Sequence, residues 1–338
     1  MPKRIGAFGE VMMRLQVPGV QQLSQGNTLN YSFSGTGVNV SSALARFGHE
    51  GYLISRLPDN SLGEAAAAYL RKLGITSTFV RRGGEYLGLY FLENGFGVRP
   101  SKVTYSNRLE SSFNRAPEGA YDYEAIARHM NAVHFCGITL AMNDSVRQHM
   151  KSLARAVKQQ GGIVIFDCNY RPSLWGAAGY SQAKPHYEEM LRLADIVMMN
   201  EKDAIFILGM SAIQDQPEEQ LIELIPEVAK QYDISVIAGT HRSIHGDNSH
   251  SLRGFLYKNQ SFSYSDTLRF LVYDRIGAGD AFTSGIVHGE LNGFTSEHTV
   301  RFAAAASMLA HTVEGDTPMA SESEVLRAMS QFVSDVER

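Results

Sequence analysis

The feature that most constrains the fold is a regular alternation of short apolar segments and helix-like segments from residue 121 onward. The runs at 163–166 and 196–199 are apolar at every position, which is typical of strands that are covered on both faces. Between such runs, residues 146–157 repeat apolar side chains with the period of a helix. This alternation predicts an α/β protein with a doubly wound, mainly parallel sheet.

The N-terminal part contains fewer regular elements. A short apolar strand at 5–9 is followed by a less regular segment that reaches Phe33. Apolar residues within 40–47 then fall on one helical face, and Gly48 is a stop signal for that helix. A further strand is expected at 52–54, so this region joins the same α/β body.

A different pattern occupies residues 83–114. Strand-like segments alternate there with Gly-containing turns, and no helical period is present. We therefore predict a small β-sheet set apart from the main body as a lid. The whole chain, 1–338, is interpreted as one α/β domain, with the lid contributed by about 10–34 and 83–114.

Composition excludes several classes of protein. The 31 Lys and Arg residues against 35 Asp and Glu residues give a formal net charge of -4, so no overall basic field exists to hold nucleic acid or an anionic membrane. The N-terminal residues show no basic segment followed by a long apolar stretch, and we expect neither secretion nor membrane insertion. Cys136 and Cys168 have no C-x-x-C or metal-ligand spacing, which favours a reducing cytoplasm.

The most informative motif is D-R-I-G-A-G-D at 274–280, directly before an Ala-rich helical run. Small residues allow backbone N–H groups at a helix start to approach an anion, and the helix dipole favours negative charge there. Asp280 follows these glycines and can accept a proton from a hydroxyl beside a transferring phosphoryl group. Taken alone, a G-x-G-D sequence is more often a turn with a capping aspartate.

Two other motifs lie upstream. Residues 34–39, S-G-T-G-V-N, lead straight into the helix that ends at Gly48, and N-E-K-D at 200–203 follows a buried strand. No G-x-x-x-x-G-K-[ST] loop and no G-x-G-x-x-G after a strand is present, which argues against P-loop and dinucleotide-binding proteins. The histidines show no metal spacing, and we assign His241, His245 and His250 to loops.

Together these motifs resemble the signatures of the ribokinase-like carbohydrate kinases. Residues 274–280 resemble that family's D-T-x-G-A-G-D, and residues 35–39 resemble its G-G-x-x-x-N sugar-binding signature with Thr36 in place of the second glycine. The resemblance implies a ribokinase-like fold with ATP and Mg²⁺ as cofactors, and it leaves a monovalent cation open. Asp280 would be the catalytic base, and the anion hole would be formed by Gly277, Ala278 and Gly279.

Finer features resemble the 2-keto-3-deoxygluconate kinases within that family. These are D-C-N-Y-R-P at 167–172, Gly9-Glu10, and Asp274-Arg275 before the anion hole. In that group the matching Arg171 meets the substrate carboxylate, and an arginine stands two residues after the second lid tyrosine. Here Asn107 occupies that position and Arg108 follows it, so either residue can replace the lid arginine.

The resemblance therefore implies three sets of site residues. The sugar side comprises Gly35, Thr36, Gly37, Val38, Asn39, Tyr90, Tyr105, Asn107, Arg108, Arg171 and Asp316. The nucleotide side comprises Asn169, Arg171, Asn200, Gly239, Thr240, Arg242, Gly277, Gly279 and Ala304. The metal side comprises Asn200, Asp203 and Asp274.

Alternative functions stay open on the sequence alone. Arg171 would be a surface residue and Tyr90 and Tyr105 ordinary strand residues if the resemblance failed. A fructokinase or ribokinase acting on a neutral sugar is the nearest alternative, and a non-catalytic sugar-binding regulator of the same fold is more distant. No motif distinguishes the gluconate from the galactonate epimer. An uncovered strand edge on the lid favours a homo-oligomer.

Overall fold

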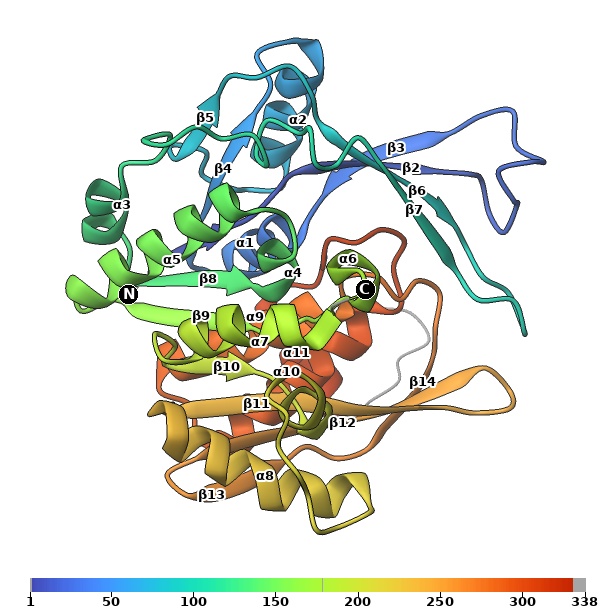
Figure 1. Cartoon of the computed structure of the whole chain (residues 1–338). Coiled ribbons are helices and arrows are strands. Elements are labelled where there is room, and N and C mark those ends of the chain that lie inside the picture. Colours follow the sequence, from blue (N-terminus) through green and yellow to red (C-terminus); the bar gives the residue numbers. More distant parts are fainter. Residues whose placement is uncertain (1, 178, 331–338) are drawn as a thin grey trace.

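The computed structural model describes residues 2–177 and 179–330. A large sheet runs through the middle of the molecule, and a smaller sheet projects from one end of it (Figure 1). In spatial order the large sheet consists of β13 (Ser261–Tyr264), β12 (Ser249–Lys258), β11 (Val236–Ile244), β10 (Ile196–Met198), β9 (Ile163–Asp167), β8 (Ala132–Cys136), β1 (Arg4–Phe8), β4 (Glu50–Leu57) and β5 (Val80–Arg82), with β14 (Leu268–Leu271) paired to β12.

Seven neighbouring strands of the large sheet are parallel to one another: β11, β10, β9, β8, β1, β4 and β5. This arrangement confirms the predicted doubly wound, mainly parallel sheet. The antiparallel edge formed by β12, β13 and β14 was not predicted. Strands β13 and β14 are mostly exposed or partly exposed, and β12 has polar residues and a glycine before its apolar end, so these strands lack the continuous apolar runs that identify the central strands.

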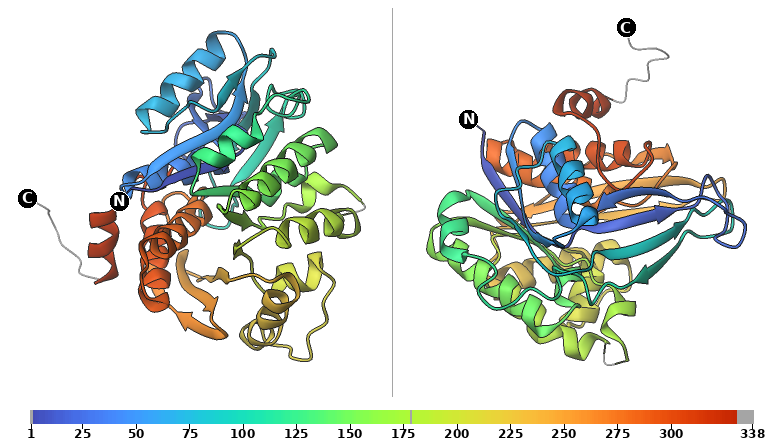
Figure 2. Two further views of the ribbon diagram at one scale, coloured as in Figure 1. Left: turned by 90° about the vertical axis from the view of Figure 1, so that its left-hand side faces the viewer. Right: turned by 90° about the horizontal axis from the view of Figure 1, so that it is seen from above.

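Helices cover both faces of the large sheet (Figure 2). Along β9, Val164 and Phe166 belong to the core on one face, and Ile165 belongs to the core on the other. None of the helices in the described part of the chain is long and apolar enough to cross a bilayer. The helices are α1 (Thr36–Arg46), α2 (Ser61–Lys72), α3 (Tyr123–His129), α4 (Gly137–Leu140), α5 (Asp144–Gln159), α6 (Pro172–Trp175), α7 (Gly179–Leu191), η1 (Asp203–Ile207), α8 (Pro217–Tyr232), α9 (Ala278–Asn292), α10 (Ser296–Ala310) and α11 (Glu322–Met329).

Local sequence explains where these helices begin and end. Helix α1 was predicted from its apolar face, and its Val40 and Leu44 are fully buried. Gly48 follows it with a φ of 85°, a left-handed conformation that favours glycine. At the start of α5, Asn143 accepts a hydrogen bond from the Val146 N–H, and this cap satisfies one of the free amides of the first turn.

The small sheet has the order β3 (Asn30–Ser34), β2 (Met12–Gln16), β6 (Gly88–Glu93) and β7 (Lys102–Ser106). All four strands fall within the segments 10–34 and 83–114 that we assigned to the lid. The segment after residue 9 is more regular than expected, because β2 and β3 pair there as antiparallel neighbours. Figure 1 shows the small sheet extending beyond the end of the large sheet.

Candidate active site

A pocket of about 710 Å³ lies where the small sheet meets the carboxyl ends of the central strands. This is the usual place for a ligand in an open α/β sheet. Most of the predicted residues line it: Gly35, Thr36, Asn39, Tyr90, Tyr105, Arg108, Asn169, Arg171, Asn200, Asp203, Gly239, Thr240, Arg242, Gly277, Ala278, Gly279, Asp280 and Asp316. The predicted residues outside the lining are Gly37, Val38, Asn107, Asp274 and Ala304.

The turn before α9 forms one wall of the pocket. Gly277 has a φ of 84°, and a Cβ at this position would overlap the carbonyl oxygen of Asp316. Only glycine fits there, which explains why the motif needs it. At Gly279 a Cβ would meet no atom within 4 Å, so the backbone at the helix start borders open space. The first N–H groups of the 15-residue helix α9 therefore face a space that suits an anion.

Asp280 lies in the first turn of α9 and is only 7% exposed. Its Oδ2 accepts a hydrogen bond of 2.7 Å from Nδ2 of Asn39, which comes from α1. The Asn39 amide oxygen accepts in turn from the Thr317 hydroxyl at 3.3 Å. Burial raises the pKa of Asp280 to about 7, and the negative charge of Asp316 acts in the same direction. A carboxylate with such a pKa suits proton transfer near neutral pH.

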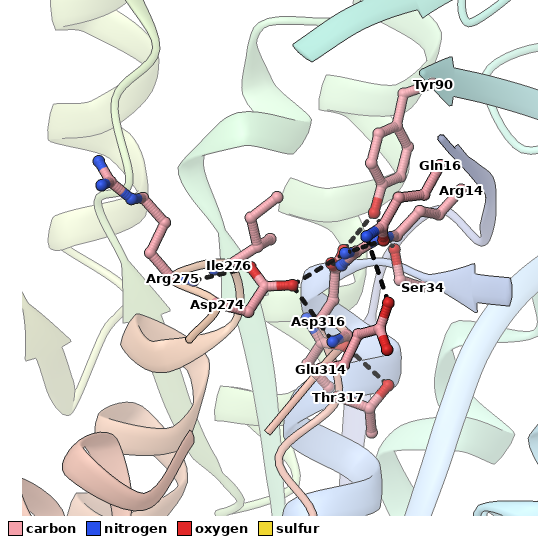
Figure 3. A network of polar contacts seen from close by, with 12 residues as sticks. Arg14, Gln16, Ser34, Tyr90, Asp274, Arg275, Ile276, Glu314, Asp316 and Thr317 are labelled. Atoms are coloured by element: carbon pink, nitrogen blue, oxygen red, sulfur yellow. Dashed lines mark hydrogen bonds and ion pairs between the residues drawn. The ribbon is translucent and has the colours of Figure 1, made fainter. Parts of the chain in front are cut away.

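Tyr90 and Asp316 lie together at the base of the small sheet (Figure 3). The Tyr90 hydroxyl donates to Asp316 Oδ2 and lies 2.9 Å from the Ser34 hydroxyl. The other Asp316 oxygen, Oδ1, accepts from the buried guanidinium of Arg14. The ring of Tyr105 lies next to that of Tyr90, with a centroid distance of 6.3 Å. These residues form a polar floor with an aromatic side, which suits a sugar.

The chain turns sharply after β7, and this turn decides which lid residue faces the pocket. Asn107 has a φ of 57°, a left-handed conformation that interrupts the alternation of the strand. As a result Arg108 lines the pocket and Asn107 does not. The Arg108 Nε donates to Glu10 Oε2 at 2.9 Å, and its guanidinium lies 4.8 Å from the centroid of the Tyr105 ring. Its Nη1 is buried and has no hydrogen-bond partner among the residues that the structure describes.

Arg171 also lines the pocket, and it is more exposed than Arg108. Its side chain is exposed, and within the described ranges Nη1 donates only to the carbonyl of Tyr170, at 3.2 Å. Burial raises the pKa of Asp280, Asp167 and Asp203, and the positive charge of Arg171 opposes that rise at each of them. Arg171 is therefore near all three carboxyl groups and keeps donors available for a ligand.

Carboxyl groups gather at the ends of β9 and β10. Burial raises the pKa of Asp167 to about 8 and that of Asp203 to about 6. Asp203 Oδ2 accepts from the Asn200 N–H at 2.9 Å, while Asn200 Oδ1 accepts from the Lys202 N–H at 3.0 Å. Within the described ranges, no group of three or more His, Cys, Asp or Glu side chains could hold a metal ion. Two carboxylates and an amide nevertheless fit Mg²⁺, which usually takes one or two protein carboxylates and completes its shell with water and phosphate.

The segment 239–242 lies inside β11. The assignment of His241 and His250 to loops was wrong, because they lie in β11 and β12. His241 Nε2 lies 2.8 Å from Oε2 of the buried Glu201. Ala304 is completely buried in α10 and packs with Leu252 and Leu268.

Arg242 and Arg275 border the same side of the pocket. Burial lowers the pKa of Arg242, and the charge of Arg275 lowers it further. Two guanidinium groups close enough to repel each other are stabilised when an anion lies between them.

Three acidic or basic side chains of the pocket were not predicted as site residues, although each stands within or beside a quoted motif. Glu10 follows Gly9, Asp167 opens D-C-N-Y-R-P, and Arg275 stands in the anion-hole motif. Glu10 is 6% exposed, and besides Arg108 it accepts from the Ser111 hydroxyl at 2.7 Å. Glu10 therefore holds the guanidinium group of Arg108 in place through its Nε atom. The signal in each case was a charged residue beside an apolar strand or a glycine turn.

Comparison with known proteins agrees with this geometry. Residues 2–323 match the family described as pfkB family carbohydrate kinase. A 2-dehydro-3-deoxygalactonokinase from Haloferax volcanii is 28% identical over 100% of both chains. Among solved structures, a provisional 2-keto-3-deoxygluconate kinase from Enterococcus faecalis is 39% identical with a TM-score of 0.95 over 99% of both chains. A 2-dehydro-3-deoxygluconokinase from Thermotoga maritima is 31% identical with a TM-score of 0.92, covering 97% of this chain and 99% of that one. This chain belongs to the pfkB family of carbohydrate kinases.

Proposed function

We propose that the protein transfers the γ-phosphoryl group of ATP to a hydroxyl of a sugar acid, most specifically 2-keto-3-deoxygluconate. The observation that carries this choice is the pair of arginines, Arg108 and Arg171, which border one pocket with donors that no protein acceptor uses fully. Neutral sugars offer no carboxylate for a guanidinium, whereas a sugar acid can take two parallel N–H bonds from it. The relatives from Enterococcus and Thermotoga, both named for the keto acid, support the same choice.

Phosphoryl transfer requires mainly positioning and neutralisation of charge. The N–H groups at Gly277, Ala278 and Gly279 would stabilise the transferring group, because the start of α9 borders the pocket there. Asp280 would orient the sugar hydroxyl and accept its proton, with Asn39 holding the carboxylate in place. Asp316 and Tyr90 would bind sugar hydroxyls from the floor of the pocket.

The nucleotide would lie along Asn200, Thr240 and Arg242, with its phosphates beside Arg275. Asn200, Asp203 and Asp167 are the side chains that would hold Mg²⁺. That ion supplies charge neutralisation on the ATP phosphates. The proposal assigns no monovalent cation to Asp274, because both of its carboxylate oxygens already accept hydrogen bonds.

The galactonate epimer of the same keto acid is a second candidate, favoured by the full-length similarity to the Haloferax relative. The test is a coupled assay of ADP release with purified protein, ATP and Mg²⁺ across both keto acids, gluconate, fructose and ribose. We expect the highest kcat/KM for one of the two keto acids. A preference for fructose or ribose would refute the sugar-acid assignment, and the absence of ADP release with every sugar would favour a non-catalytic regulator.

A further inference from the structure

Arg14 is a charged residue in the middle of the small sheet, yet it is only 1% exposed. Its strand, β2, is paired on both sides, with β3 and β6. Within the strand, Gln16 Oε1 accepts from the Arg14 Nε at 3.0 Å. A buried guanidinium that is satisfied in this way is fixed in orientation, so its remaining donors point in set directions.

Those donors reach two acids that are distant in sequence (Figure 3). Nη2 donates to Asp274 Oδ2 at 2.8 Å, and Nη1 pairs with Asp316 Oδ1. Asp274 opens the anion-hole motif, and Asp316 stands in the segment after α10. Burial lowers the pKa of Arg14, but the charges of Asp316 and Asp274 outweigh it and raise the pKa above its ordinary value. Arg14 therefore stays charged and joins three separate segments of the chain.

Asp274 connects Arg14 to the backbone turn that forms the anion hole. Its Oδ1 accepts from the backbone N–H of Arg275 at 2.7 Å and of Ile276 at 3.2 Å. These bonds fix the shape of the turn that delivers Gly277 to the pocket. Oδ2, which accepts from Arg14, also accepts from the Gly315 N–H at 3.2 Å. The position of the carboxylate thus sets the position of both neighbouring segments.

Asp316 connects Arg14 to Tyr90 and to Gly277. Its carboxylate binds the Tyr90 hydroxyl, and its carbonyl oxygen lies against Gly277 so closely that no Cβ fits there. The next residue, Thr317, donates to Asn39, which holds Asp280. A displacement of Arg14 would therefore also displace the polar floor of the pocket, the anion hole and the carboxylate of Asp280.

Stability alone does not account for this arrangement. Burying one guanidinium with two carboxylates requires the removal of water from three charges, and apolar side chains of similar volume are often equally stabilising. What apolar side chains cannot do is hold two carboxylates at fixed angles.

We propose that Arg14 is a positioning residue of the phosphoryl-transfer site. It connects the small sheet to Asp274 and Asp316, and so holds the anion hole and the polar floor of the pocket at the distance from each other that catalysis requires. The proposal rests on the roles given above to the anion hole and Asp280. Arg14 is not among the residues that line the pocket, and it acts through the two acids. We therefore expect a substitution of Arg14 to lower kcat by more than it lowers the fraction of folded protein.

The test uses Arg14→Lys, Arg14→Met, Asp274→Asn and the double variant Arg14→Met with Asp274→Asn. Arg82→Lys serves as a control, because Arg82 of β5 pairs with Glu64 of helix α2, and neither residue lines the pocket. For each protein, the folded fraction is measured by thermal unfolding and kcat and KM by ADP release. The assays use whichever sugar the wild type turns over best, so an error in the sugar-acid assignment does not decide this test.

We expect Arg14→Lys to fold and to lose about 10- to 100-fold in kcat per folded molecule, the scale of a misplaced catalytic geometry. Its KM for ATP should change less than about threefold, since the proposed nucleotide contacts at Asn200, Thr240 and Arg242 are not part of the Arg14 contacts described above. If Arg14 acts through Asp274, the double variant should be about as slow as the slower single variant, which is the signature of a shared path.

Removing one carboxylate together with the guanidinium also leaves less unpaired charge, so the double variant should fold better than Arg14→Met. Arg82→Lys should keep the wild-type kcat. Wild-type kcat per folded molecule in Arg14→Lys, or losses that multiply in the double variant, would overturn the proposal.

Discussion

Asp280 owes its proposed chemistry to its surroundings more than to its residue type. Asn39 fixes one carboxylate oxygen, and burial holds the pKa near 7. For Asp280→Asn we expect kcat to fall by at least about 100-fold, because the amide keeps the shape and loses the base. The KM for sugar should change little. Steady-state kinetics on the folded variant is the measurement, and near-normal turnover would contradict the assignment of the base.

Arg171 is the residue through which acidic and neutral sugars should be distinguished. For Arg171→Ala we expect kcat/KM toward the keto acid to fall by a factor that corresponds to about 2 to 3 kcal/mol of lost transition-state stabilisation. This is the scale of a hydrogen bond to a charged group. Weak activity on neutral ketoses should be much less affected. Arg171→Lys should restore only part of the loss, because an ammonium cannot donate two parallel bonds. Equal losses for both classes of sugar would contradict the role.

Arg108 and its neighbour provide a matched pair of variants. For Arg108→Ala we expect the KM for the sugar acid to rise at least about tenfold, since an arginine held by Glu10 over Tyr105 loses no entropy of its own on binding. Asn107→Gly should leave KM within about threefold, because glycine also adopts the left-handed backbone at this position. The reverse ranking would mean that Asn107 replaces the lid arginine.

The difference between Asp280 and Arg14 shows how far sequence reasoning reaches at this scale. Asp280 could be predicted because glycines, aspartate and helix are consecutive in the chain. Arg14 could not, because its acid partners lie 260 and 302 residues further on. An arginine between apolar neighbours in a short strand is ordinarily interpreted as a surface residue. The same limit applies to Glu10, whose contact with Arg108 spans 98 residues.

Strand β7 is the element best suited to act as a cover for the pocket. All five of its residues are exposed, and it pairs only with β6 in the described part of the chain. If the small sheet closes over sugar, residues 102–106 should gain protection from hydrogen exchange when sugar is added at constant protein concentration. Strand β9, buried in the large sheet, serves as an internal control. Unchanged exchange across β7 at saturating sugar would remove its role as a lid.

At the scale of elements, the sequence predicted best what depends on burial. The central strands and α1 were predicted because continuous apolar runs and a helical period mark them. Strand β3 lies in the segment 10–34 assigned to the lid, but it was not predicted as a separate strand because its first two residues, Asn30 and Tyr31, are exposed and carry no apolar pattern. The antiparallel edge was not predicted because β13 and β14 are mostly exposed or partly exposed, and because Ser249, His250 and Arg253 interrupt the apolar residues of β12.

Across the whole molecule, buried titratable groups of two kinds have opposite effects on stability. Burial raises the pKa of Asp167 and Asp280 to about 8 and about 7, so the folded state binds their protons more tightly than the unfolded state. The stability they contribute is fully present below about pH 4 and is lost as the pH rises through those values. Burial lowers the pKa of His134 to about 3 and of His49 to about 4, and their contribution is instead lost as the pH falls below about 6.5.

Between about pH 4 and 6.5 these effects oppose each other, and above about pH 6.5 only the carboxyl groups continue to titrate. The ligand-free protein should therefore become less stable from about pH 6.5 to 8. Each group can contribute up to about 1.4 kcal/mol per pH unit, and because both border the open pocket, where water moderates the effect, we expect a total loss of about 1 to 2 kcal/mol. Urea denaturation at the two pH values measures it. Asp167→Asn should flatten the dependence, because an amide has no proton to lose, whereas a free energy of unfolding that rises over this range would show that these carboxyl groups are already ionised in the folded protein.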